Sequence, residues 1–212
     1  LMTGDEQATS AGLKALEFME RFTIPRASQV WEIPVHTPDI MGSAAGAEAF
    51  RLGYLLTGEI DYLERARYWI DTGLPFVYFW GHPQWRYWEY ATIPVFGATF
   101  YRAPNWIGLP VQWCGLVYAE EALRFSALTD NDLYRRVAEG IVRSGMWQQD
   151  TGERFYGLLP DSYEFAAEQG RPPFINPETI LRPWWLLYGY DFRVNTVVVE
   201  REGAGPIRIS AP

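Results

Sequence analysis

The sequence has few of the residues that build disulfides, metal sites and basic surfaces. Its 212 residues include one cysteine, two histidines and a single lysine, Lys14. One cysteine excludes an internal disulfide and a cysteine-rich zinc site. The formal net charge of −8 argues against nucleic acid as the main partner, because phosphate binding requires a basic surface. No apolar run reaches the roughly 18 residues of a membrane span, so no membrane insertion is expected.

Aromatic side chains, in contrast, are abundant. They make up 17% of the residues and include 10 tryptophans. A hydrophobic content of 48% argues against disorder, and the chain is long enough for one domain with a sizeable core. Many tryptophans can mean a heavy aromatic core, or a surface on which the apolar faces of pyranose rings stack. Their positions along the chain decide between the two.

Two segments of the chain, 55–66 and 127–138, are similar in sequence position by position. The second segment lies 72 residues after the first, and we call this distance the repeat offset. The apolar residues between 134 and 142 follow the spacing of an amphipathic helix, and the repeat offset relates them to similar residues of the first copy. Each copy therefore predicts two helices joined by a short turn, as in a helical repeat.

Polar residues and glycines suggest where the outer helix of each copy begins and ends. Asp61 and Glu64 resemble a capping box at a helix start. Gly73 and Gly145, which correspond at the repeat offset, stand where glycines that end helices are expected.

The sequence predicts six helices: two helical hairpins in the middle, and a single helix, half of a hairpin, at each end. We expect a mainly α fold, an array of antiparallel helical hairpins over residues 1–190. Helices are also predicted at 11–22, 38–56 and 177–188, and the small residues from 42 to 49 suit a buried inner helix. The stretch 194–211 reads as a strand, a turn and a second strand, so residues 191–212 form a β-hairpin tail or begin a β-sandwich domain.

The predicted connections differ in length on the two sides of the array. The turns at 57–60 and 129–131 are short, whereas the connections 23–37, 74–111 and 146–176 are long. In an up-and-down array the long connections share one end, and long ordered loops on a rigid scaffold often carry function. About seven of the ten tryptophans lie in or beside them. We expect about half of the aromatic rings at this end to be packing.

Over about residues 10–190 the sequence resembles part of an (α/α) toroid, the ring of helical hairpins found in six-hairpin glycosidases and in several polysaccharide lyases. The resemblance rests on the segments LTGEIDYLERARYWIDTG and LTDNDLYRRVAEGIVRSG, on the small-residue helix, and on QVWEIPVHTPD, PVQWCG and GLLPDSYEF. It implies that inner helices start at the long-loop end, which lines a substrate cleft. Six helices make about half of such a ring, so the rest of a longer chain or a second copy is expected to complete it.

The chemistry of glycoside cleavage selects candidate catalytic residues in the long connections. Hydrolysis requires two carboxylates across the scissile bond, whereas elimination uses a tyrosine or histidine base and a group that neutralises a uronate. The candidates are Glu32, His36, Asp39, Glu89 and Glu178. Asp39 and Glu178 each follow a cap residue and a proline, so helix capping alone could explain both acids. A loop histidine and a surface carboxylate remain the alternatives for His36 and Glu32.

Aromatic and amide side chains nearby are candidates for binding sugar rings and hydroxyls, and Arg86 could pair with a uronate. The candidate substrate-binding residues are Trp31, Trp80, Trp85, Arg86, Tyr87, Trp88, Trp106, Gln112 and Trp113. No metal site and no cofactor is expected.

Together these features predict a carbohydrate-active enzyme, a glycosidase before a lyase. The alternatives are a non-catalytic carbohydrate-binding or scaffold domain, and a helical-repeat interaction protein. The carbohydrate interpretation favours a periplasmic or secreted location.

Overall fold

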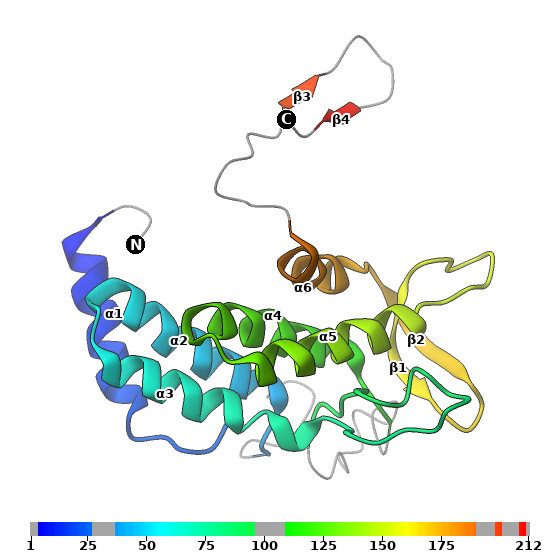
Figure 1. The fold of residues 1–212 in the computed structure, drawn as a ribbon, viewed down its shortest axis with the longest axis horizontal. Coiled ribbons are helices and arrows are strands. Elements are labelled where there is room, and N and C mark those ends of the chain that lie inside the picture. Colours follow the sequence, from blue (N-terminus) through cyan, green and yellow to red (C-terminus); the bar gives the residue numbers. More distant parts are fainter. Residues whose placement is uncertain (1–3, 27–36, 96–108, 190–197, 201–207, 211–212) are drawn as a thin grey trace.

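A computed structural model describes residues 4–26, 37–95, 109–189, 198–200 and 208–210. Helices dominate the described residues and are joined as antiparallel hairpins, which confirms the predicted mainly α fold (Figure 1). The helices are α1 (Glu6–Met19), α2 (Ile40–Thr57), α3 (Ile60–Asp71), α4 (Gln112–Thr129), α5 (Asp132–Trp147) and α6 (Glu178–Tyr188), with a short 3₁₀ helix η1 (Leu74–Phe76). The predicted C-terminal hairpin is also confirmed, because β3 (Val198–Glu200) pairs antiparallel with β4 (Arg208–Ser210).

The helices form two rows. The inner helices α2, α4 and α6 all begin at the long-connection end, and α4 packs between the other two. The outer helices α3 and α5 pack on α2 and α4 as their hairpin partners. The α5 helix shows the predicted amphipathic face: it buries Tyr134, Val137, Ala138, Ile141 and Val142. Figure 1 shows the helices side by side, with the long connections and the β1–β2 hairpin at one end.

Small residues allow α2 to pack closely against its outer partner. A Cβ atom on Gly46 would overlap the indole of the buried Trp69 on α3. By contrast, a Cβ on Gly12 of the exposed helix α1 would meet no atom within 4 Å. The two glycines therefore have different roles, although both lie inside helices.

This contrast gives a matched pair of substitutions. Gly46→Ala should lower the free energy of unfolding by about 1–3 kcal/mol, because the indole of Trp69 must move. Gly12→Ala should raise it by about 0.5–1 kcal/mol, since alanine is the better helix former. Chemical denaturation of both variants measures the difference. Equal effects would contradict the close packing of α2 on α3.

The helix ends differ from the sequence predictions in three places. Helix α2 is capped by Asp39 itself, whose Oδ1 accepts from the backbone N–H of Gly42 at 2.6 Å, so the predicted start at Pro38 is wrong. Gly73 has an ordinary φ of −84°, and its lack of a side chain admits the ring of Tyr118. Gly145 lies inside α5. Left-handed residues end the inner helices α2 and α4: they are Gly58 and Asp130, which correspond at the repeat offset.

The third long connection contains a hairpin that the sequence analysis did not predict. Strand β1 (Leu159–Glu164) pairs antiparallel with β2 (Gln169–Ile175), from Leu159 opposite Ile175 to Glu164 opposite Gln169.

The predicted capping box is absent: α3 starts at Ile60, and its cap Glu59 makes no side-chain cap bond. Among the described residues, no helix is long and apolar enough to cross a membrane.

Candidate functional site

Backbone hydrogen bonds tie the long connections into one ordered layer. They join residues that are distant in sequence and lie beside the starts of α2 and α4. The bonds run from Asp39 N to Pro25 O (2.8 Å), Ile40 N to Pro94 O (3.0 Å), Val111 N to Thr92 O (2.9 Å) and Tyr163 N to Pro110 O (3.0 Å). These bonds fix the backbone at this end of the molecule, so the side chains that it carries are held in defined positions.

Aromatic rings pack together on this layer in a group that we call the loop-end aromatic cluster. Its members are Tyr78, Trp80, Trp85, Tyr87, Trp88, Tyr163 and Phe165. Trp88 lies at its centre, with ring centroids 5.2 Å from Trp80, 5.4 Å from Trp85 and 4.9 Å from Phe165. Trp80 is 59% exposed, whereas Trp85 and Trp88 are half-buried. The cluster thus presents one open indole on a base of packed rings.

Further candidate residues lie in the same layer. The guanidinium of Arg86 lies 5.9 Å from the ring centroid of Trp147, which is exposed. Trp113 is half-buried in the first turn of α4 and donates its indole N–H to Oδ1 of Asp161 at 3.2 Å. The four candidates Trp31, Glu32, His36 and Trp106 lie outside the described residues.

Gln112, a predicted sugar ligand, is a buried residue whose side chain joins distant segments by hydrogen bonds. Its side chain is 1% exposed. The amide oxygen accepts from Thr92 N at 2.9 Å and from Gln148 Nε2 at 3.2 Å. The amide nitrogen donates to the carbonyls of Ile141 (2.9 Å) and Tyr90 (3.1 Å). Gln112 therefore fixes the connection that carries the aromatic cluster onto α4 and α5.

Tyr90 adds a strained position to this connection. Its φ of 61° lies in the left-handed region, which is unfavourable for a bulky side chain. Its ring occupies the space beside Gly140, where a Cβ atom would overlap it. The bond from Gln112 and the gap at Gly140 together hold Tyr90 in this conformation.

The described acidic candidates lie on separate elements. Asp39 is fully buried as the cap of α2, whereas the sequence pattern placed the cap two residues earlier, at Thr37. Glu89 is exposed in the connection after α3. Glu178 is exposed in the first turn of α6, where its N–H donates to Oδ1 of Asn176 at 3.1 Å. Asn176 thus satisfies a backbone N–H at this helix start, as the capping pattern indicated.

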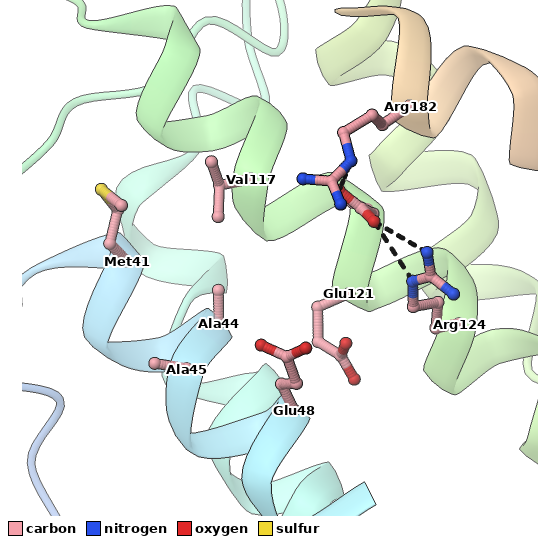
Figure 2. A pocket seen from close by; sticks show the side chains of 9 residues that line it. Met41, Ala44, Ala45, Glu48, Val117, Glu121, Arg124 and Arg182 are labelled. Atoms are coloured by element: carbon pink, nitrogen blue, oxygen red, sulfur yellow. Dashed lines mark hydrogen bonds and ion pairs between the residues drawn. The ribbon is translucent and has the colours of Figure 1, made fainter. Parts of the chain in front are cut away.

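A second group of charges, missed by the sequence analysis, lies on the inner helices. A cavity of about 200 Å³ opens between α2, α4 and α6 (Figure 2). Its charged lining consists of Glu48, Glu120, Glu121, Arg124 and Arg182, and its apolar lining of Met41, Ala44, Ala45 and Val117. Glu48 and Glu120 occupy equivalent positions of the repeat. The repeat offset could therefore have indicated from the sequence that both carboxylates lie on inner helices.

Most of these charges are already paired. Oε1 of Glu120 accepts from Arg124 at 2.8 Å, and its Oε2 lies 3.5 Å from Arg182. Arg51 donates to both oxygens of Glu121, at 2.5 and 3.0 Å, and both side chains are buried. Burial raises the pKa of Glu121, Arg51 acts in the opposite direction, and the nearby charge of Glu48 raises it further. Glu48 is the exposed carboxylate of the group. No group of three or more His, Cys, Asp or Glu in the described ranges is arranged to hold a metal ion.

Comparison with known proteins supports the fold assignment. No family model and no curated protein matches the sequence. The structure is similar to that of a GH76 α-mannanase from Bacteroides thetaiotaomicron, with a TM-score of 0.63 and 15% sequence identity. The match covers 85% of this chain and 49% of the mannanase, so the chain spans about half the length of that protein. The likeness shows the fold, which is that of part of an (α/α) toroid, as the sequence resemblance implied.

Proposed function

We propose that the chain acts on an oligo- or polysaccharide, as part of a glycoside hydrolase-like protein, through the aromatic surface at its loop end. The observation that carries the proposal is the exposure of Trp80 on a base of packed rings, in a layer held by buried hydrogen bonds. An exposed indole whose position is fixed suits the apolar face of a sugar ring, because little side-chain freedom is lost on binding.

The first substrate to test is α-mannan, since the structurally similar protein is named as an α-mannanase. A panel of neutral and uronic polysaccharides should be tested beside it. Hydrolysis would release reducing ends, whereas elimination would create an unsaturated product that absorbs in the ultraviolet. Retention on a polysaccharide without either product would support the second candidate, a non-catalytic binding domain. That candidate is favoured by the separation of Asp39, Glu89 and Glu178 on different elements.

The described tyrosines of the aromatic cluster are poorly suited to act as the base of an elimination. Burial raises the pKa of Tyr163 to about 12, and it also raises the pKa values of Tyr78 and Tyr87. A tyrosine that abstracts a proton must be deprotonated readily, and a raised pKa opposes this.

Removing the open indole tests the binding surface directly. Trp80→Ala should weaken polysaccharide binding about tenfold, which corresponds to about 1.4 kcal/mol, because the stacking face is lost. Affinity electrophoresis in gels that contain the polysaccharide measures the change. Trp185→Ala is the matched control, since it removes another exposed indole that lies on α6. Equal retention of both variants would contradict the proposed surface.

A further inference from the structure

Arg86 lies in a turn that is docked on the end of α5. The turn runs from Trp85 to Trp88 and is closed by the bond from Trp88 N to Trp85 O at 3.0 Å. The carbonyl of Tyr87 accepts from the hydroxyl of Ser144 on α5 at 2.6 Å, and Ser144 is fully buried. These bonds fix the backbone on both sides of Arg86, so its side chain starts from a defined position.

The guanidinium of Arg86 is held over an aromatic ring and has no acidic partner. It lies 5.9 Å from the ring centroid of Trp147, the last residue of α5. Both side chains are exposed. The ion pairs of the described residues involve other arginines, although Glu89 follows Arg86 by three residues. A ring beneath a guanidinium orients it and leaves its N–H donors available to a ligand.

A second arginine at this end of the molecule is arranged in a similar way. The guanidinium of Arg154 lies 5.0 Å from the ring centroid of Phe155, which stacks on Phe174 of β2 at 4.3 Å. Arg154 is exposed and takes part in none of the ion pairs of the described residues. In contrast, Arg171 on β2 is already paired with Glu164 on β1. The two stacked arginines therefore differ from Arg171 in having no acidic partner there.

The surroundings of Arg86 indicate which anion it suits. Trp88, which ends the turn of Arg86, packs against the open indole of Trp80 at 5.2 Å, so the arginine adjoins the face on which a sugar ring would stack. The fork of a guanidinium matches the two oxygens of a carboxylate. A uronate carries its carboxylate directly on the sugar ring. One ligand of this kind thus supplies both a ring for the indole and a carboxylate for the arginine.

We propose that the loop-end surface binds a polysaccharide that contains uronate residues, and that Arg86 binds a uronate carboxylate. This inference rests on the proposed function and names the substrate class of the same surface. Arg154 offers a second guanidinium to another uronate of the same polymer. Acidic residues outnumber basic ones by 26 to 18 in the whole chain, so the attraction for this polyanion is local to the two arginines.

Retention on uronate polymers tests the assignment. Polygalacturonate, polyglucuronate and alginate are each compared with their carboxyl-reduced forms, which keep the backbone and lose the charge. The preferred uronate polymer should be bound about tenfold more tightly than its reduced form, because a charge-assisted contact is lost on reduction. Arg86→Gln should lower the affinity for the uronate polymer by about the same factor and leave that for the reduced form unchanged. Arg86→Lys keeps the charge without the planar fork, so it should restore only part of the affinity.

Arg171→Gln is the matched control, since it removes a positive charge at the same end from an arginine that already has an acidic partner. It should change uronate binding little, with urea denaturation used to verify the folding of every variant. Equal losses in Arg86→Gln and Arg171→Gln overturn the inference, as does tighter retention on dextran sulfate than on any uronate polymer. Equal retention of uronate polymers, their reduced forms and α-mannan overturns it as well, but leaves the proposed function standing if Trp80→Ala abolishes that retention. No retention on any polymer overturns both.

Discussion

Replacing Arg51 by methionine should lower the free energy of unfolding by about 3–5 kcal/mol, because the buried carboxylate of Glu121 loses its partner. The pair joins α2 to α4 through two hydrogen bonds, and the side chains of Arg51 and Glu121 are only 8% and 6% exposed. The double variant Arg51→Met/Glu121→Leu should recover most of this loss, since it leaves no isolated charge. Urea denaturation of the three proteins measures the effect. A double variant as unstable as Arg51→Met would contradict this explanation.

The surface pair Arg136–Asp132 provides the control. Its atoms lie 3.0 Å apart, but the two side chains are 68% and 70% exposed. Arg136→Met should therefore change stability little, because water and salt already screen the pair.

The loss in Arg51→Met should also depend on pH. Burial raises the pKa of Glu121 in the folded chain, and removing Arg51 raises it further. A carboxyl group whose folded pKa exceeds its unfolded value binds its proton more tightly in the folded state. Its contribution to stability is therefore present at low pH and is lost as pH rises through the folded pKa. The deficit of the variant should thus be largest near neutral pH and smaller in mild acid.

Gln112→Leu should be the second most damaging change, with a loss of about 3 kcal/mol or more. The substitution leaves the N–H of Thr92 and the carbonyls of Tyr90 and Ile141 without their side-chain partner, and each buried unsatisfied group costs about 1–3 kcal/mol. Tyr90 would also lose a restraint on its strained backbone. The loss should appear both in urea denaturation and in weaker polysaccharide retention, because the connection to Trp80 loosens.

Gln149→Leu is a suitable comparison for this change. Gln149 donates one amide bond, to the carbonyl of Gly157, and lies near the surface. Its replacement should cost about 0.5–1.5 kcal/mol and leave the aromatic cluster in place. If Gln112→Leu were equally mild, the role of Gln112 as the main anchor of the connection would be wrong.

The positions of the helices could be predicted from the sequence, because apolar spacing within a helix is a local pattern. The apolar spacing of residues 134–142 reappears as the buried face of α5, and the repeat offset locates both hairpins. The same offset relates Gly58 to Asp130, which both end their helices in a left-handed conformation. The glycine-based prediction failed for the outer helices, because α3 ends in the right-handed Thr72 and Gly145 lies inside α5.

The site was less predictable because the role of a polar side chain depends on its burial. The sequence around Gln112 is compatible with either a sugar ligand or a buried residue that anchors the connection. Which role applies depends on its contacts with Thr92 and Ile141, which lie in distant segments of the chain. Strand β2 carries two adjacent prolines and is mostly exposed, so it lacks the alternation that marks a strand. The pairing of Arg51 with Glu121 joins two helices that are far apart in sequence and leaves no local pattern.

The backbone bonds that tie the long connections together also bear on the order of folding. The hairpins α2–α3 and α4–α5 join neighbouring segments and can form early, because their loop-closure entropy is small. The bond from Ile40 to Pro94 closes over the α2–α3 hairpin and the bond from Tyr163 to Pro110 closes over the α4–α5 hairpin, so each can form only once the hairpin between its partners has formed. The end that carries the aromatic cluster is thus assembled after the hairpins, and hydrogen exchange of these backbone N–H groups should show protection later than in α2 to α5.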